Sequence, residues 1–384
     1  MQSGGCTNVL NRSLYGLASE FTRTGEGTLY GVPHGFEGLL EGRSVNLSSV
    51  SESQWATVAN APGAAIGSTR RKLRDEDVDS VFDFMDRVDI GFWFIIGGND
   101  SAETGHTLQT LSGERGYDLC VVNVPKTIDN DLVLTDHCPG YGSAARFIAL
   151  AVMGSGRDAE AMQGASPITI MEVMGRDAGW LAAASALAKR DERDAPHVIC
   201  VPEVPQTEDD FISRVEHAYA KHGFCVAVIS ENTRTPGGNP IGGQDEPWFT
   251  DDFGHQYYDG PARYLAGLAS RTLGVRARYE KPGTIQRSFI EAASEPDLQE
   301  AEMAGRAAVT AALNGNRGVM ITLERDETHG YNCFTGVALL EQVGGLVRPM
   351  PDSFLSRDEG FVTQDFINYL KPLVGPLPTM GRLI

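Results

Sequence analysis

The 384-residue sequence lacks the features of several protein classes. It contains no run of about 18 apolar residues, which a membrane-spanning helix requires, so we expect no membrane contact. We find no signal peptide, no internal repeat and no low-complexity tract. Its 32 Lys and Arg residues are outnumbered by 51 Asp and Glu residues, which gives a formal net charge of -19. A charge of this sign argues against a surface that binds nucleic acid.

Cysteine is scarce and is not spaced for metal binding or disulfide chemistry. The six cysteines form no CxxC pair, and the eight histidines also lack ligand spacing. We therefore expect reduced thiols, a cytoplasmic protein and no zinc site. Hydrophobic residues make up 41% of the chain and charged residues 22%, which allows a large core. The length allows two or three domains.

Short apolar runs alternate with helical patterns along most of the chain. The patterns at Val9–Ala18 and Trp180–Ala188 predict helices. Residues 233–247 are the most loop-like segment. The alternation predicts an α/β protein, with βαβ units and parallel sheets that are covered on both faces. The predicted strands are Asp89–Ile96, Leu119–Val124, Ile168–Val173, His197–Val201, Cys225–Ser230 and Gly318–Leu323.

The most informative segment is Val121–Leu132, VVNVPKTIDNDL. A valine-rich run leads into Lys126, Asp129 and Asp131, which is typical of a buried strand that ends in a cluster of charge. Open α/β sheets place their chemistry at this edge. Two acids and a lysine there suggest a general base beside a bound anion. Taken alone, the segment is equally consistent with a polar turn, since Asp and Asn are common turn residues.

Two glycine pairs also precede predicted helices. In Ile95–Thr104, IIGGNDSAET, the glycines let the backbone approach a ligand, and Asn99 and Asp100 follow as polar groups. A strand-to-helix turn with an ordinary cap is the alternative reading. Gly4-Gly5 has the pattern of a phosphate loop, yet only three residues come before it. Either its first strand lies before these residues, or the loop is held in another way.

Basic residues form separate clusters in this acidic chain. Each cluster alone is typical of a solvated surface, whereas several clusters near strand ends are what two phosphorylated ligands require. The clusters contain Arg70, Arg71 and Lys72, then Arg176, and then Arg278 and Arg287.

Together these segments resemble the 6-phosphofructokinase family and, within it, the pyrophosphate-dependent branch. The resemblance runs in family order from Gln2 to Arg287 and rests on general pattern after about Ile290. It implies an α/β fold of two Rossmann-like lobes with parallel-rich sheets and an active-site cleft between them. Residues 1–140 with about 287–340 would form the phosphoryl-donor lobe, and about 141–286 with 341–384 the sugar-phosphate lobe. The matching segments are QSGG, GSTRRKL, IGGNDS, PKTIDND, PGYGSA, EVMGRDAGW, VPEVP, ISEN and GTIQR.

The resemblance implies Mg²⁺-dependent, reversible phosphoryl transfer from pyrophosphate to the 1-hydroxyl of fructose 6-phosphate, in a dimer or tetramer. Asp129 would accept the hydroxyl proton, with Lys126 and Asp100 as the other catalytic residues. Asn99 and Asp100 would hold the metal, with help from Asp131. Gly5, Arg70 and Lys72 would bind the donor. The residues implied for the sugar phosphate are Thr127, Ile128, Asp131, Met174, Gly175, Arg176, Glu231, Arg278, Thr284 and Arg287.

Asp100 and Lys126 support the expectation about the donor, because the ATP-using branch typically has glycine at both positions. A carboxylate at position 100 would crowd and repel the α-phosphate of ATP. A lysine at position 126 would stabilise charge on the transferred or leaving phosphate.

Three positions depart from the family pattern. Asn99 stands where many relatives have a metal-binding aspartate, Pro167 where many have a basic residue, and Thr284 where histidine or tyrosine is common. The alternatives are therefore ATP as donor, sedoheptulose 7-phosphate or another sugar phosphate as acceptor, and a non-catalytic binding or regulatory protein.

Overall fold

Residues 1–242, 246–252, 254, 256–257, 259–357 and 360–383 are described by the computed structural model of this chain. The chain forms two units and passes between them several times. Unit 1 contains Met1–Tyr141, Thr250–His255 and Arg287–Arg348. Unit 2 contains Gly142–Phe249, Gln256–Gln286 and Pro349–Ile384. The predicted α/β class with parallel-rich sheets is confirmed. The assignment of the two lobes to donor and sugar phosphate stays a prediction.

Unit 1 is built on a six-stranded sheet with the order β14-β13-β6-β5-β1-β4. The neighbouring strands β5 and β6 are parallel and end together, because Gly97 pairs with Pro125. Only β14 runs antiparallel, as the second strand of a hairpin with β13. The strands are β1 (Gln2–Ser3), β4 (Ser68–Thr69), β5 (Phe92–Gly97), β6 (Cys120–Pro125), β13 (Val319–Asp326) and β14 (Asn332–Leu339).

Helices cover both faces of this sheet, because its central strands are apolar on both sides. Trp93 and Ile95 belong to a core with α2, α4 and α5, whereas Phe94 and Ile96 belong to a core with α1 and α11. Successive side chains of a strand point to opposite faces, so a continuous apolar run requires two covering layers. The helices of this unit are α1 (Leu10–Thr24), α2 (Phe36–Leu40), α3 (Glu52–Val58), α4 (Val78–Val88), α5 (Asn99–Glu114) and α11 (Glu295–Leu313).

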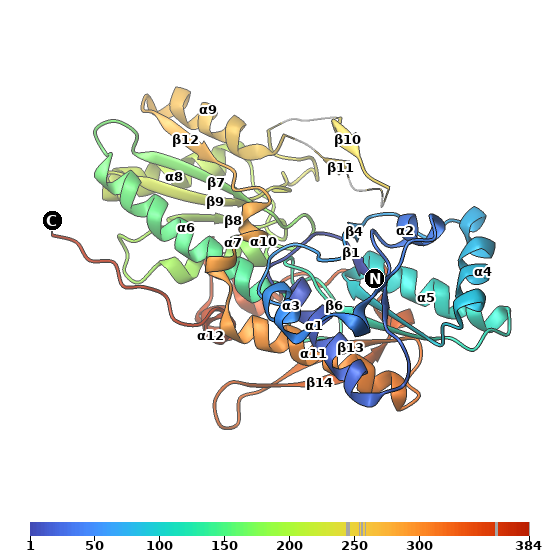
Figure 1. The fold of residues 1–384 in the computed structure, drawn as a ribbon. Helices are drawn as coiled ribbons and strands as arrows, with labels where there is room; N and C mark the ends of the chain where they lie inside the picture. The colour runs from blue at the N-terminus through green and yellow to red at the C-terminus, as the bar shows by residue number, and fades with distance from the viewer. Residues whose placement is uncertain (243–245, 253, 255, 258, 358–359, 384) are drawn as a thin grey trace. The chain divides into compact units, whose positions relative to one another are not determined.

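Unit 2 is built on an all-parallel sheet with the order β12-β7-β9-β8. Helices α8 and α9 share an apolar core with one face of this sheet (Figure 1). Its strands are β7 (Ile168–Val173), β8 (Val198–Cys200), β9 (Cys225–Ser230) and β12 (Ala277–Glu280). The helices are α6 (Tyr141–Ala161), α7 (Trp180–Ala184), α8 (Glu208–His222), α9 (Pro261–Leu273), α10 (Ile285–Ser288) and α12 (Gln364–Val374). The short strands of the chain are β2 (Tyr30–Gly31), β3 (Val45–Asn46), β10 (Phe249–Thr250), β11 (Gln256–Tyr257), β15 (Leu355–Ser356) and β16 (Phe361–Val362).

Each predicted strand and helix has a counterpart in the structure. The predicted runs Ile168–Val173 and Cys225–Ser230 match β7 and β9 end to end. The predicted loop 233–247 has a bridge between Arg234 and Pro240, and its residues 243–245 lie outside the described residues. All six cysteines are free thiols. No helix in the described part of the chain is long and apolar enough to cross a membrane.

The Gly4-Gly5 loop follows the two-residue strand β1, which lies between β4 and β5. The Gly4 amide donates to the Thr69 carbonyl at 2.9 Å, and the Ser68 hydroxyl donates to the Gly4 carbonyl at 2.6 Å. Gly4 has φ of +76°, a left-handed conformation that glycine adopts without strain. Contacts with β4 therefore hold this loop in place.

Helices α1 and α11 pack closely enough to require glycine at their contact. A Cβ atom on Gly305 would lie 2.1 Å from the Ser13 carbonyl oxygen, and one on Gly16 would lie 2.2 Å from the Glu302 carbonyl oxygen. Both obstacles are backbone atoms, so no change of rotamer can relieve the clash.

We predict that Gly305→Ala destabilises the protein by about 1–3 kcal/mol, because overpacking outweighs the better helix propensity of alanine. Gly113→Ala in α5 is the matched control, since its Cβ would meet no atom within 4 Å. Alanine should therefore stabilise that helix by about 0.5–1 kcal/mol. Urea unfolding measures both variants. Equal effects of the two substitutions would contradict the close packing of α1 on α11.

Candidate active site

Lys126 lies in unit 1 at the edge where β5 and β6 end together. Its amide donates to the Gly97 carbonyl at 3.0 Å, which continues the pairing of β5 with β6. Its side chain is 3% exposed, and Nζ donates to the Gly5 carbonyl at 2.8 Å. The lysine therefore connects the PKTIDND segment to the Gly4-Gly5 loop at the carboxyl edge of the sheet.

The environment of Lys126 lowers its pKa. Burial disfavours the charged form, and the nearby guanidinium groups of Arg287 and Arg70 disfavour it further. Together these causes lower the pKa of Lys126 to about 8. A bound anion would offset the repulsion between these cations, so the three basic groups are suited to a polyanionic ligand.

Arg287 lies beside the Gly4-Gly5 loop. A Cβ atom on Gly5 would lie only 2.3 Å from Nη1 of Arg287, so a side chain at this position would displace the guanidinium. Arg70 forms an ion pair with Asp251, which belongs to the same unit. Residues far apart in the sequence, Gly5, Arg70, Lys126 and Arg287, are thus brought to one region.

The turn after Lys126 positions the predicted base. The Thr127 amide donates to the Pro139 carbonyl at 3.2 Å, and the Asp129 amide donates to Thr127 Oγ1 at 3.1 Å. Asn130 follows with φ of +54°, and its Oδ1 accepts a hydrogen bond from the Cys138 amide at 3.0 Å. The neighbouring Ile128 side chain is buried and anchors the turn. The carboxylate of Asp129 is therefore held on a well-defined turn.

Two of the predicted metal ligands, Asn99 and Asp131, lie together. Nδ2 of Asn99 donates to Asp131 Oδ2 at 3.3 Å and to the Leu346 carbonyl at 3.2 Å. Asp100, next to Asn99 in the first turn of α5, lies 3.6 Å from Lys72 Nζ. Carboxylate and amide oxygens are ligands that Mg²⁺ prefers, so the chemistry of these side chains fits this metal. A donor set that joins Asp100 to the other two residues stays a prediction.

A second polar group lies in unit 2, where β7 and β9 end. The Glu231 amide donates to the Val173 carbonyl at 2.9 Å, and the Met174 amide donates to Gln286 Oε1 at 3.1 Å. The Arg176 carbonyl accepts from Asn232 Nδ2 at 2.6 Å. Strand ends and loop hydrogen bonds thus bring together the predicted segment 174–176 and Glu231.

The conformation of this loop requires Gly175. Its φ is +122°, and a Cβ would lie 2.7 Å from the Ala178 carbonyl oxygen. Its carbonyl accepts a hydrogen bond from the Ser230 hydroxyl. Burial raises the pKa of Glu231, and the nearby Glu172 carboxylate raises it further. A carboxyl with a raised pKa can donate or accept hydrogen bonds, which suits the hydroxyls of a sugar.

Arg278 and Thr284, also predicted for the sugar phosphate, lie on two different parts of unit 2. Arg278 pairs in register with Thr169, near the start of β7, and forms an ion pair with Asp158. It is therefore several residues along the strand from the 174–176 loop. Thr284 is exposed in the turn before α10, two residues before Gln286, which accepts from the Met174 amide. The roles of both residues stay predictions.

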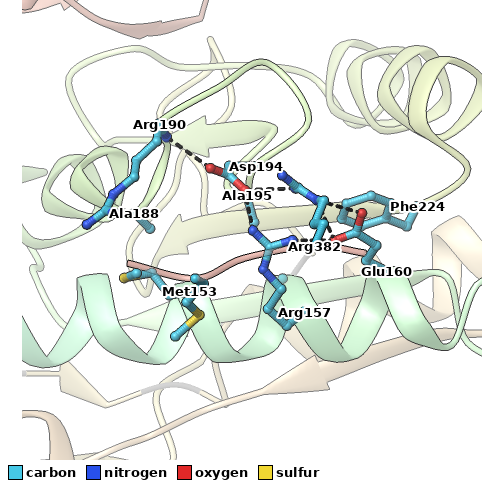
Figure 2. A pocket seen from close by; sticks show the side chains of 11 residues that line it. Met153, Arg157, Glu160, Ala188, Arg190, Asp194, Ala195, Phe224 and Arg382 are labelled. Carbon is cyan, nitrogen blue, oxygen red and sulfur yellow. Dashed lines mark hydrogen bonds and ion pairs between the residues drawn. The ribbon is translucent and has the colours of Figure 1, made fainter. Parts of the chain in front are cut away.

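Figure 2 shows a small pocket of unit 2 that does not meet the needs of such a site. Its cavity volume is only about 20 Å³, and its charged groups already bind one another. Arg157 pairs with Asp194 at 2.8 Å, and Arg382 pairs with Asp194 at 2.8 Å and with Glu160 at 2.9 Å. A sugar phosphate needs far more volume than this cavity offers. We interpret these ion pairs as contacts that hold the C-terminal segment in place through Arg382.

Comparisons with known proteins identify the family of this chain. The sequence profile of the family described as phosphofructokinase matches residues 1–312. The chain belongs to the phosphofructokinase family. The pyrophosphate–fructose 6-phosphate 1-phosphotransferase of Rhodospirillum rubrum is 37% identical, over 100% of this chain and 95% of that protein.

Other relatives show how widely this family fold extends. The crystal structure of a pyrophosphate-dependent phosphofructokinase from Nitrosospira multiformis has a TM-score of 0.88 at 32% identity, and the match covers 100% of this chain and 93% of that one. A sulfofructose kinase of Alkalicoccus urumqiensis is 32% identical, over 94% of this chain and 92% of that protein. The resemblance in sequence to the phosphofructokinase family is therefore confirmed, and the named acceptors differ among the relatives.

Arg348 is a residue of this family member that the sequence analysis missed. Its guanidinium donates to the backbone carbonyls of Asn130, Thr135 and Asp136, at 2.7, 2.6 and 2.6 Å. Its own amide donates to the Asp131 carbonyl at 2.7 Å. Arg348 thus closes the loop that carries Asp129 and Asp131. Its position 217 residues after Asp131 left no local signal in the sequence.

Proposed function

We propose that this member of the phosphofructokinase family transfers a phosphoryl group reversibly from pyrophosphate to the 1-hydroxyl of fructose 6-phosphate. The observation that supports the proposal best is the buried Lys126 ammonium, which lies next to the Gly5 carbonyl and near Arg287. This cation occupies the edge of the sheet from which Asp129 also emerges. A base and a phosphate-binding cation on one short turn are what phosphoryl transfer to a hydroxyl requires.

In this proposal each group has a defined task. Asp129 accepts the proton of the sugar hydroxyl, while Lys126, Arg70, Lys72 and the Gly4-Gly5 backbone hold the donor phosphates. The family resemblance implies that residues 174–176, Glu231, Thr127 and Ile128 bind the sugar phosphate. Asp100, Asn99 and Asp131 hold Mg²⁺, which supplies positive charge against the phosphates when it is bound. We assign Arg287 to phosphate binding on the basis of its place near Lys126. The roles of Arg278 and Thr284 at the sugar 6-phosphate stay predictions from the family resemblance.

The charge around position 100 supports pyrophosphate over ATP. Asp100 lies 3.6 Å from Lys72 Nζ, and the same lysine binds Glu103 at 2.9 Å. Because the carboxylates of Asp100 and Glu103 both lie against the Lys72 ammonium, the region at the start of α5 carries no excess positive charge. The Asp100 carboxylate would repel a nucleotide α-phosphate placed there, whereas the shorter pyrophosphate has no group at this position.

The first test measures fructose 1,6-bisphosphate formation with Mg²⁺ when pyrophosphate and ATP are offered in parallel. We expect turnover with pyrophosphate and little with ATP. In the double variant Asp100→Gly/Lys126→Gly, the kcat/KM ratio should shift toward ATP, and activity with pyrophosphate should fall. Asp79→Asn serves as a control, because it removes an exposed carboxylate that binds Arg115 at the far end of α5 from position 100. Turnover with ATP alone would contradict pyrophosphate as the donor. No turnover with either donor would favour a non-catalytic protein.

The second test replaces the base without changing its size. We predict that Asp129→Asn lowers kcat by about 10²-fold or more, the usual scale for loss of a general base. The KM values should change little, because an amide fills the same space. The neighbouring Asn130→Asp is unsuitable as a control, since Asn130 holds the turn. Asp136→Asn, on the same loop, is the better comparison and should retain most of kcat. Full turnover by Asp129→Asn would overturn the assignment of this residue.

A further inference from the structure

A second cluster of ligand-type side chains lies in unit 1, on elements that the proposed reaction does not use. His137 belongs to the segment between β6 and α6, Glu300 lies on α11, and Cys333 lies on β14. The ligand atoms of these three residues all lie within 4.8 Å of one another. His137 and Glu300 are buried, with side chains 2% and 7% exposed, and Cys333 is half-buried. The cluster therefore contains two buried ligand residues, and an ion can reach them from solvent past the half-buried Cys333.

The distances within the cluster are close to those of a metal centre. Nε2 of His137 lies 2.7 Å from Glu300 Oε2. Ligand bonds of about 2.0–2.3 Å in a tetrahedral zinc site separate neighbouring ligand atoms by about 3.3–3.8 Å. The histidine and the glutamate would thus have to separate by about 1 Å to admit the metal. The Tyr331 hydroxyl, which donates to the other oxygen of Glu300, is a further oxygen atom in contact with this cluster.

The outer groups orient the histidine as a metal ligand requires. Nδ1 of His137 lies 2.8 Å from Asp136 Oδ2, so a carboxylate can hold the proton on the nitrogen that faces away from Glu300 and Cys333. Metal-binding histidines commonly make this second contact with a carboxylate. Asp136 is fixed in turn by Arg325, whose Nε donates to Oδ2 at 3.0 Å.

The charges of the cluster also permit a divalent cation. Two carboxylates lie against the imidazole of His137, Glu300 at 2.7 Å and Asp136 at 2.8 Å. Arg325 is the cation that pairs with Asp136. A divalent cation would therefore meet one carboxylate as a ligand and a second carboxylate in the outer contact of the histidine.

We infer that His137, Glu300 and Cys333 form a binding site for a divalent transition metal, with Zn²⁺ as the best match. Nitrogen, carboxylate and thiolate ligands favour zinc over Mg²⁺, which prefers oxygen ligands. The site is separate from the oxygen-rich set around Asp100. Bound metal would join α11 and the β13–β14 hairpin to the segment that Arg348 connects to Asp131. A proton carried by a ligand atom leaves to solvent as the metal binds.

The sequence alone predicts no zinc site, because its cysteines and histidines lack local ligand spacing. His137 and Glu300 are separated by 163 residues, and only the fold brings them together. The three ligands come from a loop, a helix and a strand, so no motif connects them.

The test is a titration of the full chain with Zn²⁺, in the presence of excess Mg²⁺ to occupy oxygen-rich sites. We expect one saturable Zn²⁺ per chain, release of protons in weak buffer, and a higher Tm by mass action. With Co²⁺ as the probe, a thiolate-to-metal absorption band should appear. Cys333→Ala should lose both the band and the saturable site, and Asp136→Asn should bind Zn²⁺ about 10–100-fold more weakly.

His106→Gln is the matched control, since this histidine is exposed on α5 and away from the cluster. It should bind Zn²⁺ as the parent chain does. Cys333 is half-buried on an edge strand, so its alanine variant tests the site even where His137→Gln fails to fold. The inference is overturned when the parent shows no saturable binding, when Cys333→Ala retains it, or when Co²⁺ gives no thiolate band.

Discussion

The burial of one ammonium group is the constraint on which the candidate site depends. Lys126 follows a buried strand, and its Nζ is satisfied by the Gly5 carbonyl at 2.8 Å. The environment keeps the pKa of this lysine at about 8, since Arg287 and Arg70 add to the effect of burial. A buried cation near other cations is costly unless an anion is bound. The electrostatic environment at this edge of the sheet therefore favours a bound phosphate group. The neighbouring groups of the site surround the Lys126 ammonium.

The sequence predicted the parts of the fold that local pattern determines. β7 and β9 were predicted to the residue, because a fully buried parallel strand is a short apolar run between polar turns. The β13–β14 hairpin was only half predicted, since β14 lies at the edge and alternates exposed with half-buried residues. The unusual Gly4-Gly5 loop was recognised, but its support by β4 depends on a pairing of Gln2 with Ser68 that has no local signal.

The candidate site was predictable to the same extent. Lys126, Asp129 and Asp131 lie on one short segment, so their proximity follows from the sequence. The clamp formed by Arg348 and the approach of Arg287 to Gly5 arise from chain returns of more than two hundred residues. Arg278 shows the opposite case. The family resemblance implies that it binds the sugar phosphate, but in the structure it pairs with Asp158 and lies beside Thr169, near the start of β7. Side chains that join a site through tertiary structure need the fold before they can be placed.

The central claim is that Lys126 is the cation that receives the phosphoryl donor, and an NMR titration of its Nζ tests this most directly. In the free protein the pKa of Lys126 should lie near 8. Binding of pyrophosphate with Mg²⁺ should raise this pKa, because a nearby anion stabilises the ammonium, and protons should be taken up at pH 8. ATP with Mg²⁺ should leave the titration unchanged. A Lys126 pKa that does not respond to pyrophosphate, or that responds equally to ATP, would contradict the account.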